Sequence, residues 1–198
     1  MRITGGEMRG RTVRVPRSDV RPTQDRVREA LFSSLHDLVV GARFLDLFAG
    51  SGAVGLEALS RGAAGVCWIE SNSGVFRVLK NNVDRLWGGD DNDEALCIKS
   101  DVSRFLRGWR GQAAFDIVFA DPPYHKRGQR NSRADEPEVI LDMLAANGVV
   151  MDGGIAVIEQ GADEVLPAVE DWELMRDKRY GGSRLLFFRQ TGEKYNEQ

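Results

Sequence analysis

Apolar residues form short runs that alternate with amphipathic stretches along most of the chain. Five apolar runs have the length and composition of buried strands, and they cover residues 44–48, 65–70, 95–99, 115–120 and 155–159. The segments around them predict helices over residues 23–38, 54–60, 74–86, 101–106 and 137–146. Strands that alternate with helices in this way predict an α/β fold with a doubly wound, mostly parallel sheet.

The two ends of the chain follow different patterns. Residues 172–179 and 185–189 alternate around Gly181-Gly182, which predicts an antiparallel hairpin at the end of the sheet. Glycines interrupt residues 1–20, which indicates an irregular or hairpin-forming arm. We therefore expect an N-terminal arm over residues 1–22, one α/β domain over residues 23–190, and a disordered tail over residues 191–198.

Composition narrows the class of protein. A chain of 198 residues with 42% hydrophobic residues can bury a core without disulfides or a metal. It has no apolar run long enough to cross a bilayer and no secretory leader, so we expect a cytoplasmic protein. The two cysteines fall in predicted strands and the two histidines lack ligand spacing, which argues against a metal site.

Charge is unevenly distributed, although the net charge is only −3. Residues 1–28 contain eight arginines and three acidic residues, and residues 125–133 contain four basic residues and no acidic one. A basic arm and a basic loop on an acidic body favour a surface that binds the phosphates of a nucleic acid. The alternative is a solvated, flexible N-terminus.

A glycine motif follows the first predicted strand. Gly50, Gly52 and Gly55 have the G-x-G-x-x-G spacing that lets a backbone approach a bound nucleotide. Dinucleotide-binding proteins share this spacing, and the glycines could also serve only a tight strand–helix turn. Glu70 ends the next strand, where a carboxylate can accept hydrogen bonds from both hydroxyls of a ribose.

The fourth strand ends in Asp121-Pro122-Pro123-Tyr124. Proline has no N–H to donate, so the strand cannot continue and the chain must turn there. The Asp121 carboxylate and the Pro122 carbonyl can each accept a hydrogen of a planar amine, while the Tyr124 ring stacks on the base. This sequence is typical of methyltransferases that modify exocyclic nitrogens, and it favours S-adenosylmethionine over a nicotinamide cofactor.

Acidic residues follow four of the predicted parallel strands. Ligands of such sheets bind outside the carboxyl ends of the strands, so Asp46, Glu70, Asp101 and Asp121 are expected in one crevice. Each has a simpler explanation when taken alone, and Asp101 could be only the N-cap of a short helix.

The chain resembles the RsmD family, bacterial methyltransferases that modify the exocyclic N2 of a guanine in small-subunit (16S) ribosomal RNA. The resemblance covers roughly residues 1–190 and is carried by residues 2–6, 9–11, 21–32, 46–63 and 121–124. It implies a class I, Rossmann-like methyltransferase fold, S-adenosylmethionine as cofactor, and ribosomal RNA within the small subunit or an assembly intermediate as partner. It is compatible with a monomer. The loop over residues 125–136 departs from the family pattern because it is longer and more basic.

The resemblance also implies site residues. The catalytic set is Asp121, Pro122, Pro123 and Tyr124. The cofactor-binding set is Thr23, Arg26, Asp46, Phe48, Gly50, Ser51, Gly52, Glu70, Ser71, Asp101 and Val102. The RNA-binding set is Arg2, Arg9, Arg11, Lys126, Arg127 and Arg130.

Two other functions stay open at this point. A DNA adenine-N6 methyltransferase would share the Asp-Pro-Pro-Tyr corner, but such enzymes carry a recognition domain for which this chain has little room. A non-catalytic RNA-binding assembly factor would have no reason to keep both the corner and the glycine motif. Cytosine C5 chemistry needs a cysteine nucleophile, and Cys67 and Cys97 are not placed for it.

Overall fold

The structure is a computed structural model that describes residues 1–16, 25–88, 94–110, 114–123 and 133–191. Its strands are β1 (Arg43–Leu47), β2 (Gly65–Glu70), β3 (Ala95–Lys99), β4 (Phe115–Ala120), β5 (Val150–Gly161), β6 (Trp172–Tyr180) and β7 (Ser183–Gln190). Its α-helices are α1 (Asp25–Leu35), α2 (Ala53–Ser60), α3 (Ser73–Trp87), α4 (Val102–Gly108) and α5 (Pro137–Ala146). Two short 3-10 helices, η1 (His36–Val39) and η2 (Arg133–Asp135), complete the described elements.

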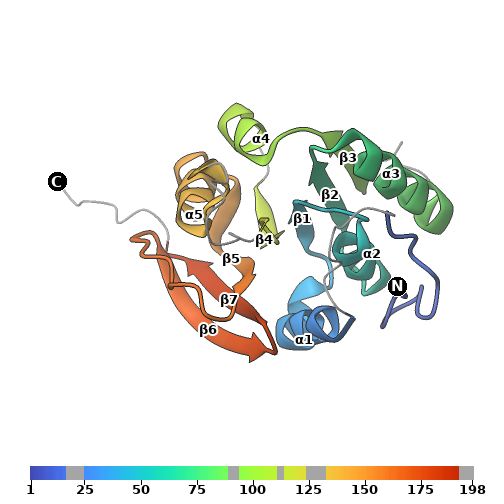
Figure 1. The fold of residues 1–198 in the computed structure, drawn as a ribbon, viewed down its shortest axis with the longest axis horizontal. Helices are drawn as coiled ribbons and strands as arrows, with labels where there is room; N and C mark the ends of the chain where they lie inside the picture. Colours follow the sequence, from blue (N-terminus) through green and yellow to red (C-terminus); the bar gives the residue numbers. More distant parts are fainter. Residues whose placement is uncertain (17–24, 89–93, 111–113, 124–132, 192–198) are drawn as a thin grey trace.

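All of these strands form one sheet in the order β3-β2-β1-β4-β5-β7-β6 (Figure 1). The pairs among β1 to β5 are parallel, while β7 runs antiparallel to both β5 and β6. The predicted doubly wound sheet with a C-terminal antiparallel hairpin is confirmed. The order reverses direction between β1 and β4, which is where a sheet of this kind opens a crevice for a ligand.

Two layers of helices cover the sheet. Residues of α1, α2 and α3 share one core cluster with strand residues such as Phe44 and Phe119. Residues of α4 and α5 form a second cluster with Leu45 and Val118. These two residues directly follow Phe44 and directly precede Phe119 in the sequence. Consecutive strand residues enter opposite clusters because side chains alternate across a sheet, and both faces are buried in a parallel sheet.

The N-terminal segment, residues 1–16, lies against α2 rather than extending into solvent. It folds back on itself through an antiparallel bridge between Arg2 and Thr12. Its apolar side chains Ile3, Met8 and Val13 are buried in the same cluster as α2. Every residue of α2 is buried as a result, because the sheet covers one side of the helix and this segment lies against the other.

Two element boundaries differ from the predicted ones by three residues or more. The first helix ends at Leu35 instead of continuing to Leu38, because His36 has a left-handed backbone with φ 48° and η1 follows. The fifth strand begins at Val150, not Ile155, because Val150 pairs with Phe115 before a register shift. The strand therefore continues through a bulge over residues 151–154, whose Asp-Gly-Gly composition predicts a loop.

Candidate active site at the carboxyl edge of the sheet

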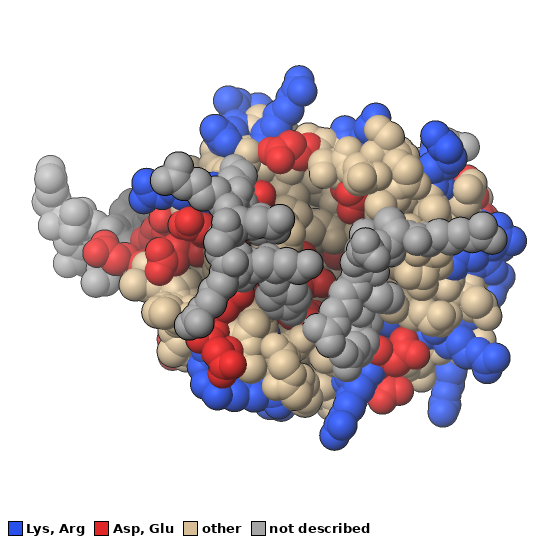
Figure 2. Space-filling model, viewed as in Figure 1, with Lys and Arg blue, Asp and Glu red and all other residues tan. Residues whose placement is uncertain are grey.

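The structure brings the predicted acidic residues to one edge of the sheet. β3, β2, β1 and β4 are consecutive neighbours, and Asp101, Glu70, Asp46 and Asp121 lie at or beside their carboxyl ends. Figure 2 shows Lys and Arg mostly around the rim of the displayed face, with acidic side chains both near the rim and further in. The order of the strands is therefore what gathers these carboxylates.

The glycine loop between β1 and α2 needs its glycines for two different reasons. Gly50 and Gly52 have φ angles of 55° and 77°, which residues with a Cβ rarely adopt. Gly55 has no such angle, but a Cβ there would overlap the buried indole of Trp68. The loop is consequently held close to the sheet, with Gly50 half-buried and Ser51 and Gly52 buried.

Two carboxylates hold this loop in place. Asp46 Oδ2 accepts a hydrogen bond of 2.9 Å from the backbone N–H of Gly55, in the first turn of α2. Glu70 accepts 3.0 Å and 2.7 Å hydrogen bonds from the N–H groups of Gly50 and Asn72, one with each oxygen. Asp46 is almost fully buried, and this burial raises its pKa well above the ordinary value, a shift that the Gly55 N–H partly opposes and Glu70 increases.

Ser51, Phe48 and Ser71, also predicted to bind a cofactor, come soon after β1 and β2, while Arg26 stands on α1. Ser51 is buried and its carbonyl accepts a 2.9 Å hydrogen bond from Asn82 Nδ2. Phe48 has a left-handed φ of 57° and is partly buried against the second core cluster, while Ser71 is exposed beside Glu70. Arg26 is exposed in the first turn of α1.

Asp101 serves as the N-cap of α4, the simpler of its two predicted roles. Its Oδ1 accepts hydrogen bonds from Ser103 Oγ at 2.7 Å and from the Arg104 N–H at 3.0 Å. The Ser103 hydroxyl is the main cause that lowers the pKa of Asp101, and the N–H groups at the start of the helix add to it. Val102 is buried directly behind it.

The Asp-Pro-Pro corner follows β4 directly. Asp121 is half-buried, Pro122 is buried, and Pro123 is exposed at the surface. Ala120, the last residue of β4, pairs with Leu47 on one side and with Ile158 on the other, so the corner stands between β1 and β5. Several residues predicted for the site lie outside the described residues: Thr23, Tyr124, Lys126, Arg127 and Arg130.

The predicted RNA-binding arginines of the N-terminal segment have different surroundings. Arg2, Arg9 and Arg11 all have exposed side chains. Arg11 Nη1 also donates a 2.9 Å hydrogen bond to the carbonyl of Leu86, near the end of α3. Arg11 therefore ties the segment to α3 in addition to presenting a charge at the surface.

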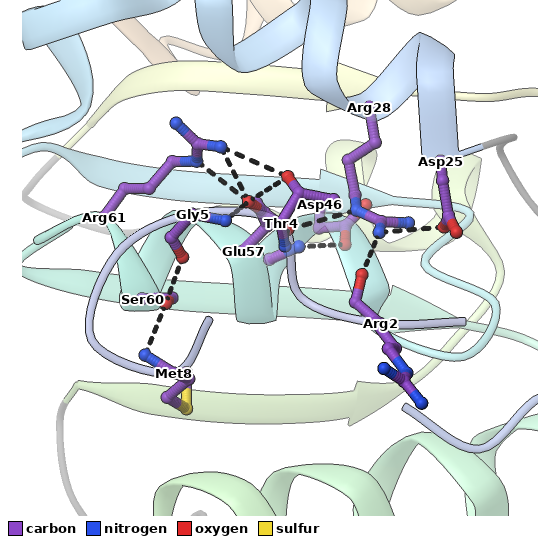
Figure 3. A network of polar contacts seen from close by, with 11 residues as sticks. Arg2, Thr4, Gly5, Met8, Asp25, Arg28, Asp46, Glu57, Ser60 and Arg61 are labelled. Carbon is purple, nitrogen blue, oxygen red and sulfur yellow. Dashed lines mark hydrogen bonds and ion pairs between the residues drawn. The ribbon is translucent and has the colours of Figure 1, made fainter. Parts of the chain in front are cut away.

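Sequence patterns did not reveal a buried ion-pair network beneath the N-terminal segment (Figure 3). Glu57 accepts hydrogen bonds from the backbone N–H groups of Thr4 and Gly5 and from the side chains of Arg28 and Arg61. Arg28 and Glu57 are both fully buried, with Arg28 Nε 3.2 Å from Glu57 Oε2. One signal was present, because Glu57 is the single charged residue of α2.

Sequence patterns also missed two polar residues at the end of β5. Glu159 and Gln160 are 3% and 1% exposed, although they stand at the same edge as the acidic residues of β1 to β4. Glu159 was expected only as the last residue of a strand, because a strand-terminal glutamate is ordinarily solvated.

Other chemistries have less support in this structure. Burial raises the pKa of the Cys67 thiol to about 12, which keeps it protonated and unsuited to nucleophilic attack. Among the described residues, no three His, Cys, Asp or Glu side chains are grouped so that they could hold a metal ion. No helix in that part of the chain is both long and apolar enough to cross a membrane. A cavity of about 280 Å³ lies between residues 38–42, 116–117 and 151–155, at the opposite edge of the sheet, and contains none of the predicted site residues.

The strand order, the antiparallel β7 between β5 and β6, and the glycine loop after β1 define a class I methyltransferase, the architecture of enzymes that use S-adenosylmethionine. The family model of conserved hypothetical protein 95 matches residues 1–189, so the chain belongs to this family. The resemblance to the RsmD family is confirmed by its relatives.

Two relatives share one name, ribosomal RNA small subunit methyltransferase D. The protein from Escherichia coli is 40% identical over 183 residues, which is 91% of this chain and 85% of the relative. The protein from Haemophilus influenzae is 35% identical over 182 residues, 91% of this chain and 89% of the relative. The solved structure of yhhF from Escherichia coli has a TM-score of 0.80 at 38% identity and covers 96% of this chain and 98% of its own.

Proposed function

We propose that this protein transfers a methyl group from S-adenosylmethionine to the exocyclic N2 of a guanine in 16S ribosomal RNA. The observation that carries the proposal is the position of the Asp121-Pro122-Pro123 corner, on the strand next to the glycine loop and at the same edge of the sheet. The names of the relatives support the choice of ribosomal RNA as the substrate. The choice of guanine N2 rests on the resemblance to the family.

The residues around the glycine loop suit S-adenosylmethionine. The backbone of Gly50, Ser51 and Gly52 would contact its methionine part. A Cβ at Gly52 would strike Leu79 of α3, so this backbone position requires glycine. Glu70, whose carboxylate now accepts backbone N–H groups, would accept the ribose hydroxyls instead or in addition. Asp101 and Val102 would border the adenine, with Phe48 and Ser71 beside them, and Thr23 and Arg26 would lie near the carboxylate end. Asp46 would act through the loop that it holds.

The chemistry that the cofactor supplies is a methyl group on a positively charged sulfur, which leaves as a neutral thioether. The amine nitrogen of guanine is a poor nucleophile because its lone pair is delocalised into the ring. Hydrogen bonds from the amine to the Asp121 carboxylate and the Pro122 carbonyl would draw the nitrogen toward a pyramidal geometry. They would also stabilise the positive charge that develops during attack. Tyr124 would stack on a guanine that has left its helix.

The partner would be the small ribosomal subunit or an assembly intermediate, in the cytoplasm, with the protein acting as a monomer. Arg2, Arg9 and Arg11 would contact RNA phosphates on the side of the N-terminal segment. Lys126, Arg127 and Arg130 would contact RNA next to the reaction centre. Arginine suits both roles because its guanidinium binds phosphate with two parallel hydrogen bonds and stacks on bases.

The test is transfer of radiolabelled methyl groups from S-adenosylmethionine to small subunits that lack the modification, followed by digestion to nucleosides. We expect label in N2-methylguanosine. Asp121→Ala should lower kcat by about 100-fold or more, since it removes one acceptor for the reacting amine, and should leave cofactor affinity unchanged. Asp116→Ala is the matched control, because Asp116 lies on the same strand and its carboxylate accepts the Arg43 N–H at the opposite edge.

Label in N6-methyladenosine from a DNA substrate would replace the proposal with the DNA adenine alternative. Cofactor binding without transfer to any nucleic acid would favour a non-catalytic RNA-binding factor. Full activity of Asp121→Ala would refute the role given to this carboxylate.

A further inference from the structure

The end of β5 places two polar side chains next to the Asp-Pro-Pro corner. β4 and β5 are parallel, and Ala120 pairs with Ile158. The residues that follow this pair lie close together, since Pro122, Pro123, Glu159 and Gln160 line one small cavity. Both polar residues are nearly fully buried at an edge of the sheet where a substrate is expected.

The amide of Gln160 has a fixed orientation. Its Nε2 donates hydrogen bonds to the carbonyl of Val165 at 3.1 Å and to that of Glu164 at 3.5 Å. A carbonyl can only accept, so the side-chain nitrogen must face the segment after β5 and the Oε1 atom must face away from it. In the described part of the chain, Oε1 is buried and has no hydrogen-bond partner.

A buried acceptor without a donor is unfavourable by about 1–3 kcal/mol, and most such groups in folded proteins find a partner. Gln160 lines a cavity of about 10 Å³, roughly the space of one water molecule. The edge of a base can reach into a space of this size, although a whole ring cannot. The lining includes Pro122, Pro123, Asp135, Glu159 and Glu164.

The prolines of this lining have neither a side-chain donor nor a backbone N–H. With Gln160 Nε2 already directed at Val165 and Glu164, the Gln160 Oε1 atom can accept a hydrogen bond from a ligand edge that donates.

We propose that Gln160 is a specificity-determining residue, whose Oε1 accepts the N1–H of the target guanine. The proposal rests on the function proposed above. In guanine, N1–H and the N2 amine are adjacent donors on one edge, and the amine would be held by Asp121 and the Pro122 carbonyl. Gln160 stands next to Pro122, where the adjacent N1–H would fall. Adenine has an unprotonated N1, whose lone pair would face the Oε1 lone pair at this position.

The test uses small subunits assembled with 2,6-diaminopurine in place of the one guanine that receives the methyl group. This base keeps an amine at C2 but has no hydrogen on N1, so it removes the proposed contact and keeps the reacting group. Wild-type enzyme should methylate guanine about 10- to 100-fold more efficiently, as kcat/KM, than diaminopurine. Gln160→Met, which has similar length and no acceptor oxygen of this kind, should reduce this preference to about threefold or less.

Gln190→Met is the matched control. Gln190 also has a buried Oε1 without a partner among the described residues, but it lies at the far end of β7, which pairs with the start of β6. This variant should keep the wild-type preference. Melting temperature and S-adenosylmethionine affinity, measured on each variant, report whether the fold and the cofactor site are intact.

The outcomes separate the two proposals. If wild-type enzyme transfers no methyl group to guanine, the proposed function is wrong. If wild-type enzyme methylates both bases with equal efficiency, Gln160 does not read N1–H, and this result does not depend on any variant being folded. If Gln160→Met lowers both activities by the same factor, Gln160 only anchors the segment after β5 and the inference is overturned.

Discussion

One buried carboxylate, that of Asp46, holds the glycine loop between β1 and α2 in position. Asp46 stands in β1 with 1% of its surface exposed, and its carboxylate accepts the N–H of Gly55. Aspartate is rarely buried to this extent without a charged partner, because burial disfavours the ionised form. Asp46 therefore holds the glycine loop at a cost to the stability of the fold.

This cost leads to a prediction about pH. Burial raises the pKa of Asp46 in the folded chain above its unfolded value. Between the two values the folded state holds a proton that the unfolded state lacks, so this group makes stability fall as pH rises. An asparagine side chain cannot ionise and keeps an oxygen that can accept the Gly55 N–H, so Asp46→Asn should melt at a higher temperature than wild type at pH 7.5. The difference should shrink toward pH 4, as measured by calorimetry without cofactor.

Asp37→Asn is the control for this experiment, because Asp37 is exposed in η1. It should change the melting temperature little at either pH. A difference between Asp46→Asn and wild type that stays constant from pH 4 to pH 7.5 would contradict the perturbed pKa.

At the scale of elements, α3 connects the N-terminal segment to the glycine loop. Asn82, fully buried on α3, accepts the Arg14 N–H at 3.0 Å and donates to the Arg14 carbonyl at 2.8 Å. The same amide group donates to the Ser51 carbonyl at 2.9 Å. The Asn82 side chain thus connects two segments, at Arg14 and at Ser51, that lie 37 residues apart in the sequence.

Loss of this side chain should affect cofactor binding. Asn82→Leu has a similar volume but leaves the Arg14 and Ser51 groups without their partner, and each unsatisfied group is unfavourable by about 1–3 kcal/mol. We expect a lower melting temperature and roughly tenfold weaker binding of S-adenosylmethionine by titration calorimetry, since the loop backbone shifts.

Asn81→Leu, at the exposed neighbouring position, should change neither quantity appreciably. Cofactor affinity equal to that of wild type in Asn82→Leu would show that the loop keeps its position without α3.

The sequence predicted elements whose ends carry strong local signals. The bounds of β2, β3, β4 and α5 agree with the prediction, because glycine, proline or polar residues flank compact apolar runs there. Interactions between distant segments could not be predicted in the same way. The Arg28–Glu57 pair and Gln160 are buried only because segments far apart in the chain cover them, and charged or amide side chains are ordinarily expected in water.

The candidate active site could likewise be predicted only where local sequence motifs define it. The sequence predicted that the glycine motif and the Asp-Pro-Pro corner follow parallel strands at one edge of the sheet, and both lie at the carboxyl ends of the neighbouring strands β1 and β4. Sequence spacing does not predict that the N-terminal segment covers α2, because no local pattern specifies that contact.

At the scale of the whole molecule, Lys and Arg side chains lie mostly around the rim of the displayed face (Figure 2). Exposed cations such as Arg9 would contact phosphates, and the release of counterions would make RNA binding depend strongly on salt. Arg9→Gln should weaken binding and reduce the slope of log K against log salt by about 0.8, as measured by filter binding between about 50 and 200 mM salt.

Arg189→Gln is the matched control, because Arg189 is exposed on β7 and pairs with Ile155, away from the N-terminal segment. It should leave the slope unchanged. Equal slopes for Arg9→Gln and wild type would exclude the N-terminal segment from the RNA contact surface.

The packing of the N-terminal segment against α2 has a consequence during synthesis of the chain. Thr4 binds Glu57, 53 residues further along, and Arg11 binds the carbonyl of Leu86, 75 residues further along. These contacts with α2 and α3 can therefore form only after both helices have been synthesised. Until then Ile3, Met8 and Val13 lack the α2 and α3 side chains with which they share a core cluster.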